Sequence, residues 1–512
     1  MLAADKTRSS QLKGIDVYPI YIVSAVLFLL SLGAFAYVVT TLAQAAETYK
    51  ESSTGTVILG YLNDTGLILP LLAIGFGIWL FQLGLGVYQR KYPSAAWARM
   101  LFLWLMVGIV ALLIRDLIQI FGGNASAADM IGSLALWLVL ILSIGYCMWW
   151  LAQNINIAFV GQESLFSAST RTAWNLLVPT VFVLILVAAR PLEQTFIASL
   201  TDARFASADE VSFVGFDNYA QLLGFRFDRI GCEQDADGAC VRDEEGNTVY
   251  PRARDVLSER YTNLRYREMG SVNLLGSRLV FSARDRDFFE AVSNTMIFTI
   301  ISVTLELLFG LLVAMVINSK FPGRGLMRAA MLVPWAIPTV VSARLWEMML
   351  RDNQSGIINF LGVKLGLLDS SLAWLANSDL QLPSIIAVDV WKTTPFMALI
   401  ILAGLQTISS DIYEAADVDG ASKVRQFFSL TLPLLRPTIA VALVFRTLDA
   451  VRAFDVFQVL LGSQKRSMAT YNYEQLINNQ QLGYASAVGV VIFVIILIFT
   501  ITYVRILGVN AE

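Results

Sequence analysis

Long apolar stretches, each close to the length that crosses a lipid bilayer, constrain this chain more than any other feature. They lie near residues 18–42, 67–87, 100–121, 131–151, 174–189, 291–317, 329–350, 382–405, 439–461 and 485–506. A helix of about twenty apolar residues spans the hydrocarbon core. Only 15% of the 512 residues are charged, whereas soluble domains carry about a quarter. The sequence therefore predicts an all-α membrane protein with about ten transmembrane helices.

Basic residues indicate which side of the membrane each connection faces. They gather in alternate connections, at Arg90, Lys91 and Arg99, at Arg171, at Lys320, Arg324 and Arg328, and at Lys423, Arg425 and Arg436. Cytoplasmic loops carry an excess of Lys and Arg. With the N-terminus inside, all of these connections are cytoplasmic. We therefore expect a multi-pass protein with both termini in the cytoplasm.

Residue types that the chain lacks exclude several kinds of chemistry. Histidine is absent from the whole sequence, so His-based triads, His metal sites and His pH switches are excluded. The pattern G-x-x-x-x-G-K-[ST] is also absent, so the chain has no P-loop. We expect no catalytic residues, no cofactor and no metal, and an ATP-driven process would need its ATPase on another subunit.

A polar segment interrupts the apolar stretches in mid-chain, over residues 201–289. By the orientation above it lies outside the cell. Gly238 and Gly246 are turn signals, and residues 248–250 form a short β-prone stretch near them. The sequence therefore predicts a small β-rich or mixed external domain inserted between the membrane helices.

Two cysteines lie in this segment. Cys232 and Cys240 bracket a turn, and an extracytoplasmic location permits a disulfide between them. Two free thiols are the alternative. Glu233, Asp235 and Asp237, with Gly238 and Glu244, also match a calcium-loop spacing. Because the flanking helices are missing, the sequence favours a solvated hairpin tip at this turn.

Another polar stretch, residues 411–437, separates two apolar stretches nearer the C-terminus. Ala415 and Ala416 favour a helix, Gly420 permits a break, and Pro433 can start a new element. We expect two short helices with a sharp turn at Gly420, and we expect Glu414 and Asp417 in the first turn of the first helix. A bent pair of helices of this kind can fit a groove in a soluble partner.

This stretch resembles the EAA loop of ABC importer permeases. The residues that carry the resemblance are Glu414, Ala415, Ala416, Gly420, Leu430 and Pro433. In that family the loop is cytoplasmic and docks on the ATPase subunit. The resemblance therefore implies that these residues couple ATP hydrolysis elsewhere to the membrane helices of this chain.

From residue 174 onward the chain resembles sugar-importer permeases, especially the maltose-type first permease subunit. The matching stretches follow in family order: Leu177-Val178-Pro179, Phe213 to Tyr219, Asn294-Thr295, Leu332 to Trp335, Trp391 with Pro395-Phe396, Phe445-Arg446, Phe454-Asp455 and Gly483 to Ala487. One departure is Leu461 to Lys465, where the family often has T-x-G-G-P.

The resemblance implies a division of the chain into four parts. Residues 1–173 form an N-terminal membrane extension of about four spans, and residues 174–200 form the first span of the permease core. Residues 201–289 are the external loop domain. Residues 290–512 hold the remaining core, with the coupling loop at 411–437.

Charged residues inside the predicted spans need partners or a polar cavity. Four of them alternate in sign at steps of three along one predicted helix: Arg446, Asp449, Arg452 and Asp455. Asp389 and Lys392 are also three residues apart, and Glu306 is a further acid with no assigned partner. The set is an ion ladder that joins two helices, part of the wall of a translocation cavity, or both.

The resemblance implies two clusters of sugar-binding residues. The first is Lys392, Thr393 and Phe396, where an aromatic face suits the apolar face of a pyranose. The second is Arg446, Ala450 and Ala453. Alanine at the last two positions, where a maltose permease has polar groups, argues for a different sugar.

The predicted function is the transmembrane permease of an ATP-driven importer for an oligosaccharide, such as maltose, maltodextrin or another α-glucoside like trehalose. The implied partners are a second homologous permease, two ATPase subunits and an external sugar-binding protein, in the inner membrane of a bacterium, with no nucleic acid. A proton-coupled transporter that uses Asp389, Asp449 or Glu306 as a relay is one alternative. A membrane-embedded glycosyltransferase is the other.

Overall fold

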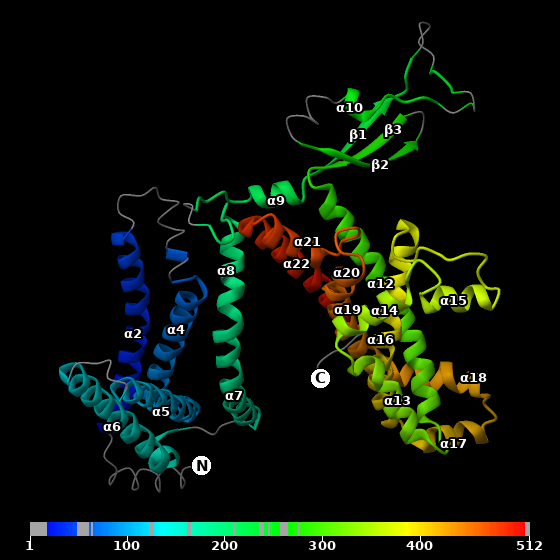
Figure 1. Ribbon diagram of the computed structural model, residues 1–512. Helices are drawn as coiled ribbons and strands as arrows, with labels where there is room; N and C mark the ends of the chain where they lie inside the picture. The colour runs from blue at the N-terminus through cyan, green and yellow to red at the C-terminus, as the bar shows by residue number, and fades with distance from the viewer. Residues whose placement is uncertain are drawn as a thin grey trace. The chain divides into compact units, whose positions relative to one another are not determined.

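The computed structural model describes residues 18–48, 61–62, 65–121, 127–160, 165–207, 211–234, 240–243, 246, 248–256, 265–274 and 277–506. The chain divides into two compact units, Met1–Ile197 and Ala198–Glu512. Helices make up most of both units, and the second also carries a small sheet (Figure 1). The predicted all-α membrane architecture with a small β-containing insertion is confirmed.

The first unit consists of long apolar helices. They are α2 (Tyr18–Thr48), α4 (Ile68–Tyr88), α5 (Tyr92–Phe121), α6 (Ala127–Ala158), α7 (Leu165–Leu184), the π-helical turn η2 (Ile185–Ala189) and the start of α8 (Arg190–Ser199). The buried faces of α2, α4, α5 and α6 share one hydrophobic core, which includes Leu27, Leu80, Phe102 and Leu151. The backbone N–H of Ile68 donates to the carboxylate of Glu193 at 2.8 Å, so a distant acid caps the start of α4.

The second unit begins with α9 (Asp217–Leu222) and then forms a three-stranded antiparallel sheet. The strands are β1 (Phe225–Gly231), β2 (Arg267–Leu274) and β3 (Ser277–Ala283), in the order β1-β3-β2, with the short helix α10 (Ala253–Val256) between β1 and β2. Phe227 lies opposite Phe281, and their ring centroids are 5.1 Å apart. Cross-strand aromatic pairs of this kind stabilise a sheet.

The segment beyond β1 holds the two cysteines considered above. Cys232 and Cys240 form a disulfide, with Cα atoms 5.5 Å apart. Asp235, Asp237 and Glu244 of the calcium-loop spacing lie outside the described residues. Among the residues that the structure does describe, no group of three His, Cys, Asp or Glu could hold a metal ion.

The helical part of the second unit follows the sheet. Its elements are α12 (Arg286–Asn318), α13 (Arg324–Ala336), α14 (Thr339–Met349), α15 (Ile357–Lys364), α16 (Ser378–Gln406), α17 (Ser410–Val418), α18 (Lys423–Gln426), η3 (Phe427–Thr431), α19 (Leu432–Val451), α20 (Asp455–Leu460), α21 (Met468–Tyr473), η4 (Glu474–Asn478) and α22 (Leu482–Ile506). Within this unit the sheet lies at one end of the helices, and α17 and α18 lie at the other (Figure 1).

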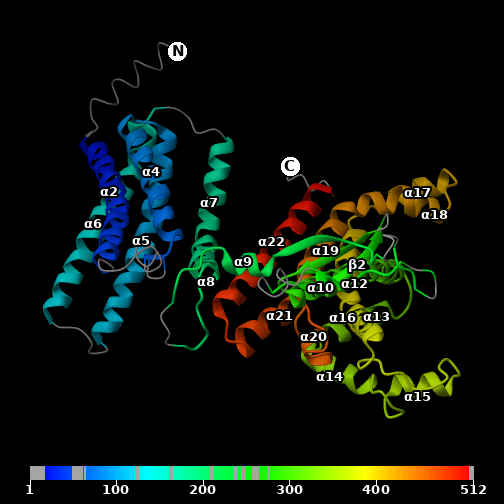
Figure 2. The same ribbon diagram turned by 90° about the horizontal axis from the view of Figure 1, so that it is seen from above.

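Three long helices, α12, α16 and α19, pack against one another at the centre of this unit (Figure 2). A Cβ atom added at Gly310 of α12 would lie 2.8 Å from the Cβ of Met397 in α16. Glycine therefore allows close contact between these two helices, as small residues commonly do between membrane helices. The close approach brings polar side chains of α12 within reach of those on α16.

Eight of the described helices are long and apolar enough to cross a membrane, or nine if α13 and α14 count as one span. The expected number was about ten. The predicted span at 329–350 is a pair of helices bent by 90°. Ile337 and Pro338 have extended backbones at the bend, because proline disfavours helical geometry in the residue before it. The predicted span at 174–189 is helical, in α7 and η2, but it is not among the eight.

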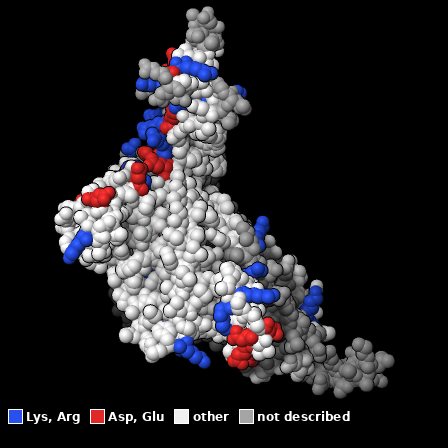
Figure 3. All heavy atoms as spheres, turned by 90° about the vertical axis from the view of Figure 1, so that its right-hand side faces the viewer, with Lys and Arg blue, Asp and Glu red and all other residues white. Residues whose placement is uncertain are grey.

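Charged side chains on the surface of the second unit follow the same division. On the face shown in Figure 3, they gather over the sheet and again at the opposite end, and the surface between is largely uncharged. An uncharged belt between charged ends is the surface expected of a bundle that crosses a bilayer.

Candidate functional site

A single arginine lies at the meeting point of the three central helices of the second unit. Arg446 of α19 is 2% exposed. Its guanidinium donates to Glu306 of α12 at 2.9 Å, to Asp389 of α16, and to Asp449 of α19 at 3.0 Å. A planar guanidinium has five N–H donors, so it can donate hydrogen bonds to three carboxylates at once. The helices are therefore joined by one network of charged hydrogen bonds, named here the Arg446 network.

Burial makes this pairing energetically important. Glu306 is fully buried and Asp389 nearly so, whereas the side chain of Asp449 is 61% exposed. An ionised carboxylate at this depth is costly unless a cation and hydrogen bonds compensate it. Arg446 supplies both, so the two buried acids depend on it. Glu306, which the sequence left without a partner, has its partner 140 residues away.

Two side chains of α16 extend the network. The hydroxyl of Thr393 contacts the Glu306 carboxylate and the backbone carbonyl of Asp389, the latter at 2.6 Å. Lys392 Nζ donates to the carbonyl oxygen of Ile337 at 2.6 Å. Because Ile337 lies at the bend between α13 and α14, Lys392 ties α16 to the bend. The structure thus brings together Lys392, Thr393 and Arg446, three of the predicted substrate-binding residues.

Aromatic side chains lie beside the bend. Phe396 of α16 stacks on Trp335 of α13, with ring centroids 5.8 Å apart and an interplanar angle of 20°. Phe396 is half-buried, and Trp335 is 47% exposed. Trp346 and Trp391 form a second pair at 5.4 Å. The stacked pair presents an aromatic surface one helical turn from Lys392 and Thr393.

The two predicted alanines have different surroundings. Ala450 is fully buried in a hydrophobic core that includes Phe298 and Phe457. Ala453 is half-buried against the same core, and its carbonyl accepts a hydrogen bond from the Ser467 hydroxyl at 2.7 Å. Both alanines contribute to packing around the end of α19.

The predicted ladder of alternating charges is interrupted. The helix α19 ends at Val451, and α20 begins at Asp455, so the prediction that all four charges share one helix is wrong. Asp449 lies 3.9 Å from Arg452, whose side chain is 69% exposed. Arg446 does pair with Asp449 of its own helix, but its two buried acids come from α12 and α16, which close helix packing brings near it.

The coupling stretch forms two short helices, as predicted, with the turn at Gly420. Gly420 has φ +72°, which L-residues with side chains rarely adopt. The N–H of Ala421 donates to the carbonyl of Ala416 at 2.9 Å, and that of Gly420 donates to Asp417 at 3.1 Å. These two bonds form a Schellman motif that ends α17.

Side chains brace this turn. Lys423 Nζ lies 2.7 Å from the carboxylate of Asp417, and Gln426 also donates to that carboxylate. The hydroxyls of Tyr413 and Thr431 are 3.0 Å apart. The hydrogen bonds from Lys423 and Gln426 lower the pKa of Asp417. The loop is therefore held in one conformation by its own polar contacts.

The expectation that Glu414 and Asp417 lie in the first turn is wrong. The helix begins at Ser410, after Ser409, whose hydroxyl accepts from the N–H of Asp411 as an N-cap. Asp411 is the acid of the first turn. Asp417 lies near the C-terminal end of α17, where Lys423 offsets the unfavourable charge.

The outer face of the coupling loop exposes apolar side chains. Val418 is 88% exposed, Val424 is 68% exposed and Phe428 is 62% exposed. Glu414 and Ala415 are exposed beside them, while Ala416 is buried. Exposed apolar residues in such a cluster are typical of a surface that binds a partner.

The second part of the loop continues into a membrane span. Leu430 lies in η3 and Pro433 in the first turn of α19, and both are half-buried. Lys423–Val451 forms one apolar helical run across these elements. Arg446 lies on that run, so the coupling loop and the Arg446 network share a single helical element.

Comparison with known proteins bears directly on this region. Residues 306–507 match the family described as the binding-protein-dependent transport system inner membrane component. The trehalose/maltose transport system permease protein MalF of Thermococcus litoralis is 43% identical over 227 residues, which is 43% of this chain and 75% of the relative. This chain belongs to that permease family.

Other members have related names. The sulfoquinovosyl glycerol transport system permease protein SmoG of Agrobacterium fabrum is 38% identical over 227 residues, 44% of this chain and 73% of the relative. The trehalose transport system permease protein SugA of Mycobacterium tuberculosis is 36% identical over 229 residues, 44% of this chain and 72% of the relative. The resemblance to permeases of sugar importers is thus confirmed.

Membership in the permease family fits the architecture. Its members are inner-membrane components of transport systems, and the chain has the multiple membrane helices that this requires. The family match contains Glu306, Asp389, Arg446 and the whole coupling loop. The whole first unit and the sheet lie outside the match, before residue 306.

Proposed function

We propose that this chain is the transmembrane permease subunit of an ATP-driven importer for an oligosaccharide, with an α-glucoside of the trehalose or maltose type as its substrate. The observation that carries the proposal is the helical run Lys423–Val451. It joins an exposed loop, suited to a soluble partner, to a buried polar network beside an aromatic surface. Movement of the loop therefore acts directly on the helix that holds Arg446.

The substrate assignment rests on two lines of support. Two of the relatives described above are named for trehalose, one of them also for maltose. In this chain, Phe396 and Trp335 offer an aromatic face beside the polar groups of Lys392 and Thr393. A disaccharide has both an apolar face and a polar rim, so it suits such a combination. Ala450 and Ala453 would shape the site through packing.

Coupling requires partners. We infer that Glu414, Ala415, Gly420 and the apolar face of the loop dock on an ATPase subunit, since this chain has no P-loop. Two such subunits, a second homologous permease and an external sugar-binding protein would complete the transporter. Both termini would be cytoplasmic and the sheet external.

The division of the chain follows the same proposal. Residues 1–173 would be a membrane extension and 174–200 the first span of the core. Residues 201–289 would form the external domain and 290–512 the rest of the core.

The test is uptake by a reconstituted transporter that contains the full chain and its candidate partner subunits. We expect uptake of trehalose or maltose, and not of sucrose or glycerol phosphate. This uptake should require ATP inside the vesicles, on the side of the membrane that the coupling loop faces. Uptake that requires a proton gradient without ATP would favour proton coupling. A chemically altered sugar recovered from the vesicles would favour a glycosyltransferase.

A variant of the coupling loop tests the proposed docking surface. Glu414→Lys changes an exposed side chain of α17 and touches no membrane span. We expect it to abolish ATP-dependent uptake and ATPase co-purification while the amount of permease in the membrane is unchanged. Normal uptake by this variant would contradict the proposed docking surface.

A further inference from the structure

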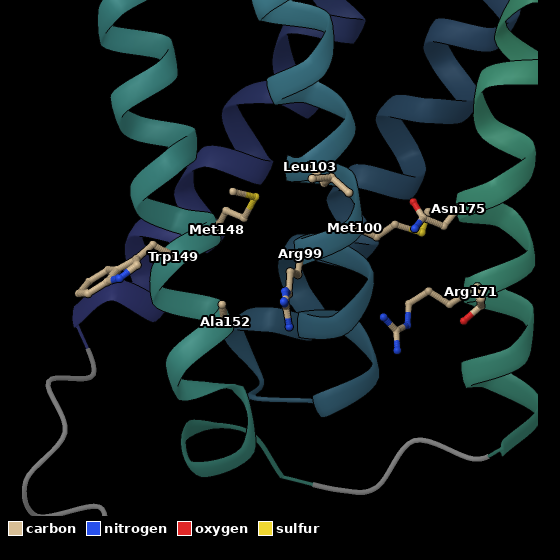
Figure 4. Close-up of a pocket in the computed structure, with 9 residues that line it drawn as sticks. Arg99, Met100, Leu103, Met148, Trp149, Ala152, Arg171 and Asn175 are labelled. Atoms are coloured by element: carbon tan, nitrogen blue, oxygen red, sulfur yellow. The ribbon is translucent and has the colours of Figure 1, made fainter.

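The first unit contains a cavity that the proposed transport function does not use. Its volume is about 620 Å³, and it lies between α5, α6 and α7 (Figure 4). Pockets of this size are typical of small-molecule sites. It falls outside the residues that match the permease family, so the function of that family does not account for it.

Two arginines, one from each of two helices, line this cavity. Arg99 of α5 and Arg171 of α7 both extend into the space between the helices (Figure 4). Asn175, one turn beyond Arg171, also lines it, and its amide oxygen accepts a hydrogen bond from Trp104 Nε1 at 2.7 Å. None of the nine described residues that line the cavity is acidic. The two arginines make the described part of the wall basic.

The rest of the lining is largely apolar. Met100 and Leu103 of α5 and Met148 of α6 form the wall beyond the arginines (Figure 4). Methionine side chains adapt to irregular apolar ligands. A small inorganic anion would leave this apolar wall uncovered, whereas an anion that carries a hydrocarbon chain would cover it.

The depth of the arginines along the helices suits the boundary between headgroups and hydrocarbon. The helix α5 has 30 residues, so it is about 45 Å long, and the hydrocarbon core is about 30 Å thick. Arg99 is about 10 Å from the first residue of α5. Backbone hydrogen bonds, Tyr92 to Val160 at 3.0 Å and Val160 to Arg90 at 2.7 Å, join the start of α5 to the segment after α6. Arg99 therefore lies near the end of the helices where Arg90 and Lys91 lie.

We propose that this cavity binds one anionic phospholipid of the cytoplasmic leaflet. The headgroup phosphate lies between Arg99 and Arg171, and an acyl chain lies against Met100, Leu103 and Met148. Guanidinium groups bind phosphate oxygens in bidentate geometry, and basic pockets between membrane helices suit anionic headgroups. The placement in the cytoplasmic leaflet follows from the basic residues of the same connection.

The experiment uses the full chain purified in detergent and titrated with phosphatidylglycerol, with phosphatidylcholine of the same acyl chains, or with inorganic phosphate. Bound lipid is counted by native mass spectrometry, and thermal stability is measured alongside. We expect one phosphatidylglycerol bound at least tenfold more tightly than phosphatidylcholine. The double variant Arg99→Gln, Arg171→Gln should lose that preference.

Two controls keep the result specific. Lys91→Gln removes one charge from the same connection outside the cavity lining, and it should retain the preference. Arg99→Lys with Arg171→Lys keeps the charges, and it should bind phosphatidylglycerol more tightly than the glutamine pair. Equal binding of the two lipids, or an unchanged preference in the glutamine double variant, would overturn the proposal. Stabilisation by inorganic phosphate alone, with no bound lipid, would overturn it too.

Discussion

At the scale of single residues, Arg446 holds the centre of the second unit together because two buried acids from other helices depend on it. Glu306 and Asp389 are carried by α12 and α16, and the same guanidinium pairs with both. Removing one partner of a buried ion pair leaves the other charged group without compensation. Assembly of the helices therefore depends on Arg446, whether or not Arg446 also contacts the substrate.

Arg446→Ala should strongly destabilise the chain, by about 3–5 kcal/mol, because Glu306 and Asp389 would remain buried and unpaired. The measurement is the amount of folded chain in the membrane and its thermal midpoint. Arg452→Ala is the matched control on the same stretch of chain. Its side chain is 69% exposed and lies 3.9 Å from Asp449, so its loss should cost about 0–1 kcal/mol. Equal effects of the two variants would contradict the central role of Arg446.

Thr393 and Phe396 should respond differently to substitution. Thr393→Val removes a hydroxyl that contacts Glu306. Leaving a buried carboxylate without one of its hydrogen-bond donors lowers the free energy of unfolding by about 1–3 kcal/mol. We therefore expect Thr393→Val to lower both stability and uptake. Phe396→Ala leaves no charge unpaired, so it should lower uptake with a smaller loss of protein. Transport assays normalised to the amount of chain in the membrane distinguish a loss of protein from a loss of transport. Normal uptake by Phe396→Ala would contradict a sugar-stacking site at Phe396.

At the scale of elements, the coupling loop is a preformed surface. A Schellman motif ends α17, and an ion pair between Asp417 and Lys423 holds the two short helices together. Its apolar side chains point outward, and its second half continues into the span that bears Arg446. A shape set by local hydrogen bonds can dock on a partner with little loss of conformational entropy.

Gly420→Val should abolish coupled uptake. Its φ of +72° costs a branched residue about 1–2 kcal/mol, which would shift the turn that positions the docking face. Gly323→Val is the control, because Gly323 also has a positive φ, of +85°, but lies before α13, away from the coupling turn. A Cβ atom added at Gly323 would meet no other atom within 4 Å. Uptake and ATPase co-purification should fail for the first variant and persist for the second. Equal loss in both would show that strain alone explains the effect.

The disulfide between Cys232 and Cys240 belongs to the sheet-bearing segment. Alkylation of the unfolded but unreduced protein should label Cys147 alone, and reduction should expose the other two cysteines. The loop closed by this bond has a sequence separation of 8 residues, so the bond restricts only its own hairpin and no part of the helical bundle. Replacing both cysteines with alanine should therefore leave assembly and uptake nearly unchanged. Labelling of all three cysteines without reduction would contradict the bond.

At the scale of the whole molecule, the chain combines two compact units. The second carries the sheet at one end of its helices and the coupling loop at the other (Figure 1). A membrane between these ends would separate the two structures. In the orientation proposed above, the positive residues of the coupling loop would lie on the cytoplasmic side, as the charge rule predicts.

Single cysteines should report this orientation in cells. The native cysteines are buried or bonded, so they give little background with a membrane-impermeant maleimide. Met269→Cys in β2 should be labelled in intact cells, and Asp419→Cys beside the coupling turn should be labelled after the cells are opened. The reverse pattern would contradict the proposed orientation.

The amino-acid sequence was enough to predict the membrane class, most of the spans, the inserted β-containing domain and the two short helices around Gly420. These features depend on apolar length, turn residues and local hydrogen bonds, all of which are encoded by neighbouring residues. It also indicated which charged residues lie at membrane depth. It did not determine their partners, because pairing depends on which helices pack together.

Tertiary structure alone decided that Glu306 pairs with Arg446 across 140 residues, that Lys392 reaches the bend at Ile337, and that Phe396 stacks on Trp335. It also decided that α19 ends at Val451, so Asp455 lies on a separate helix, α20. The physical reason is that a buried charge takes the nearest partner in space, and the packing of α12, α16 and α19 against one another brings that partner from a distant part of the chain.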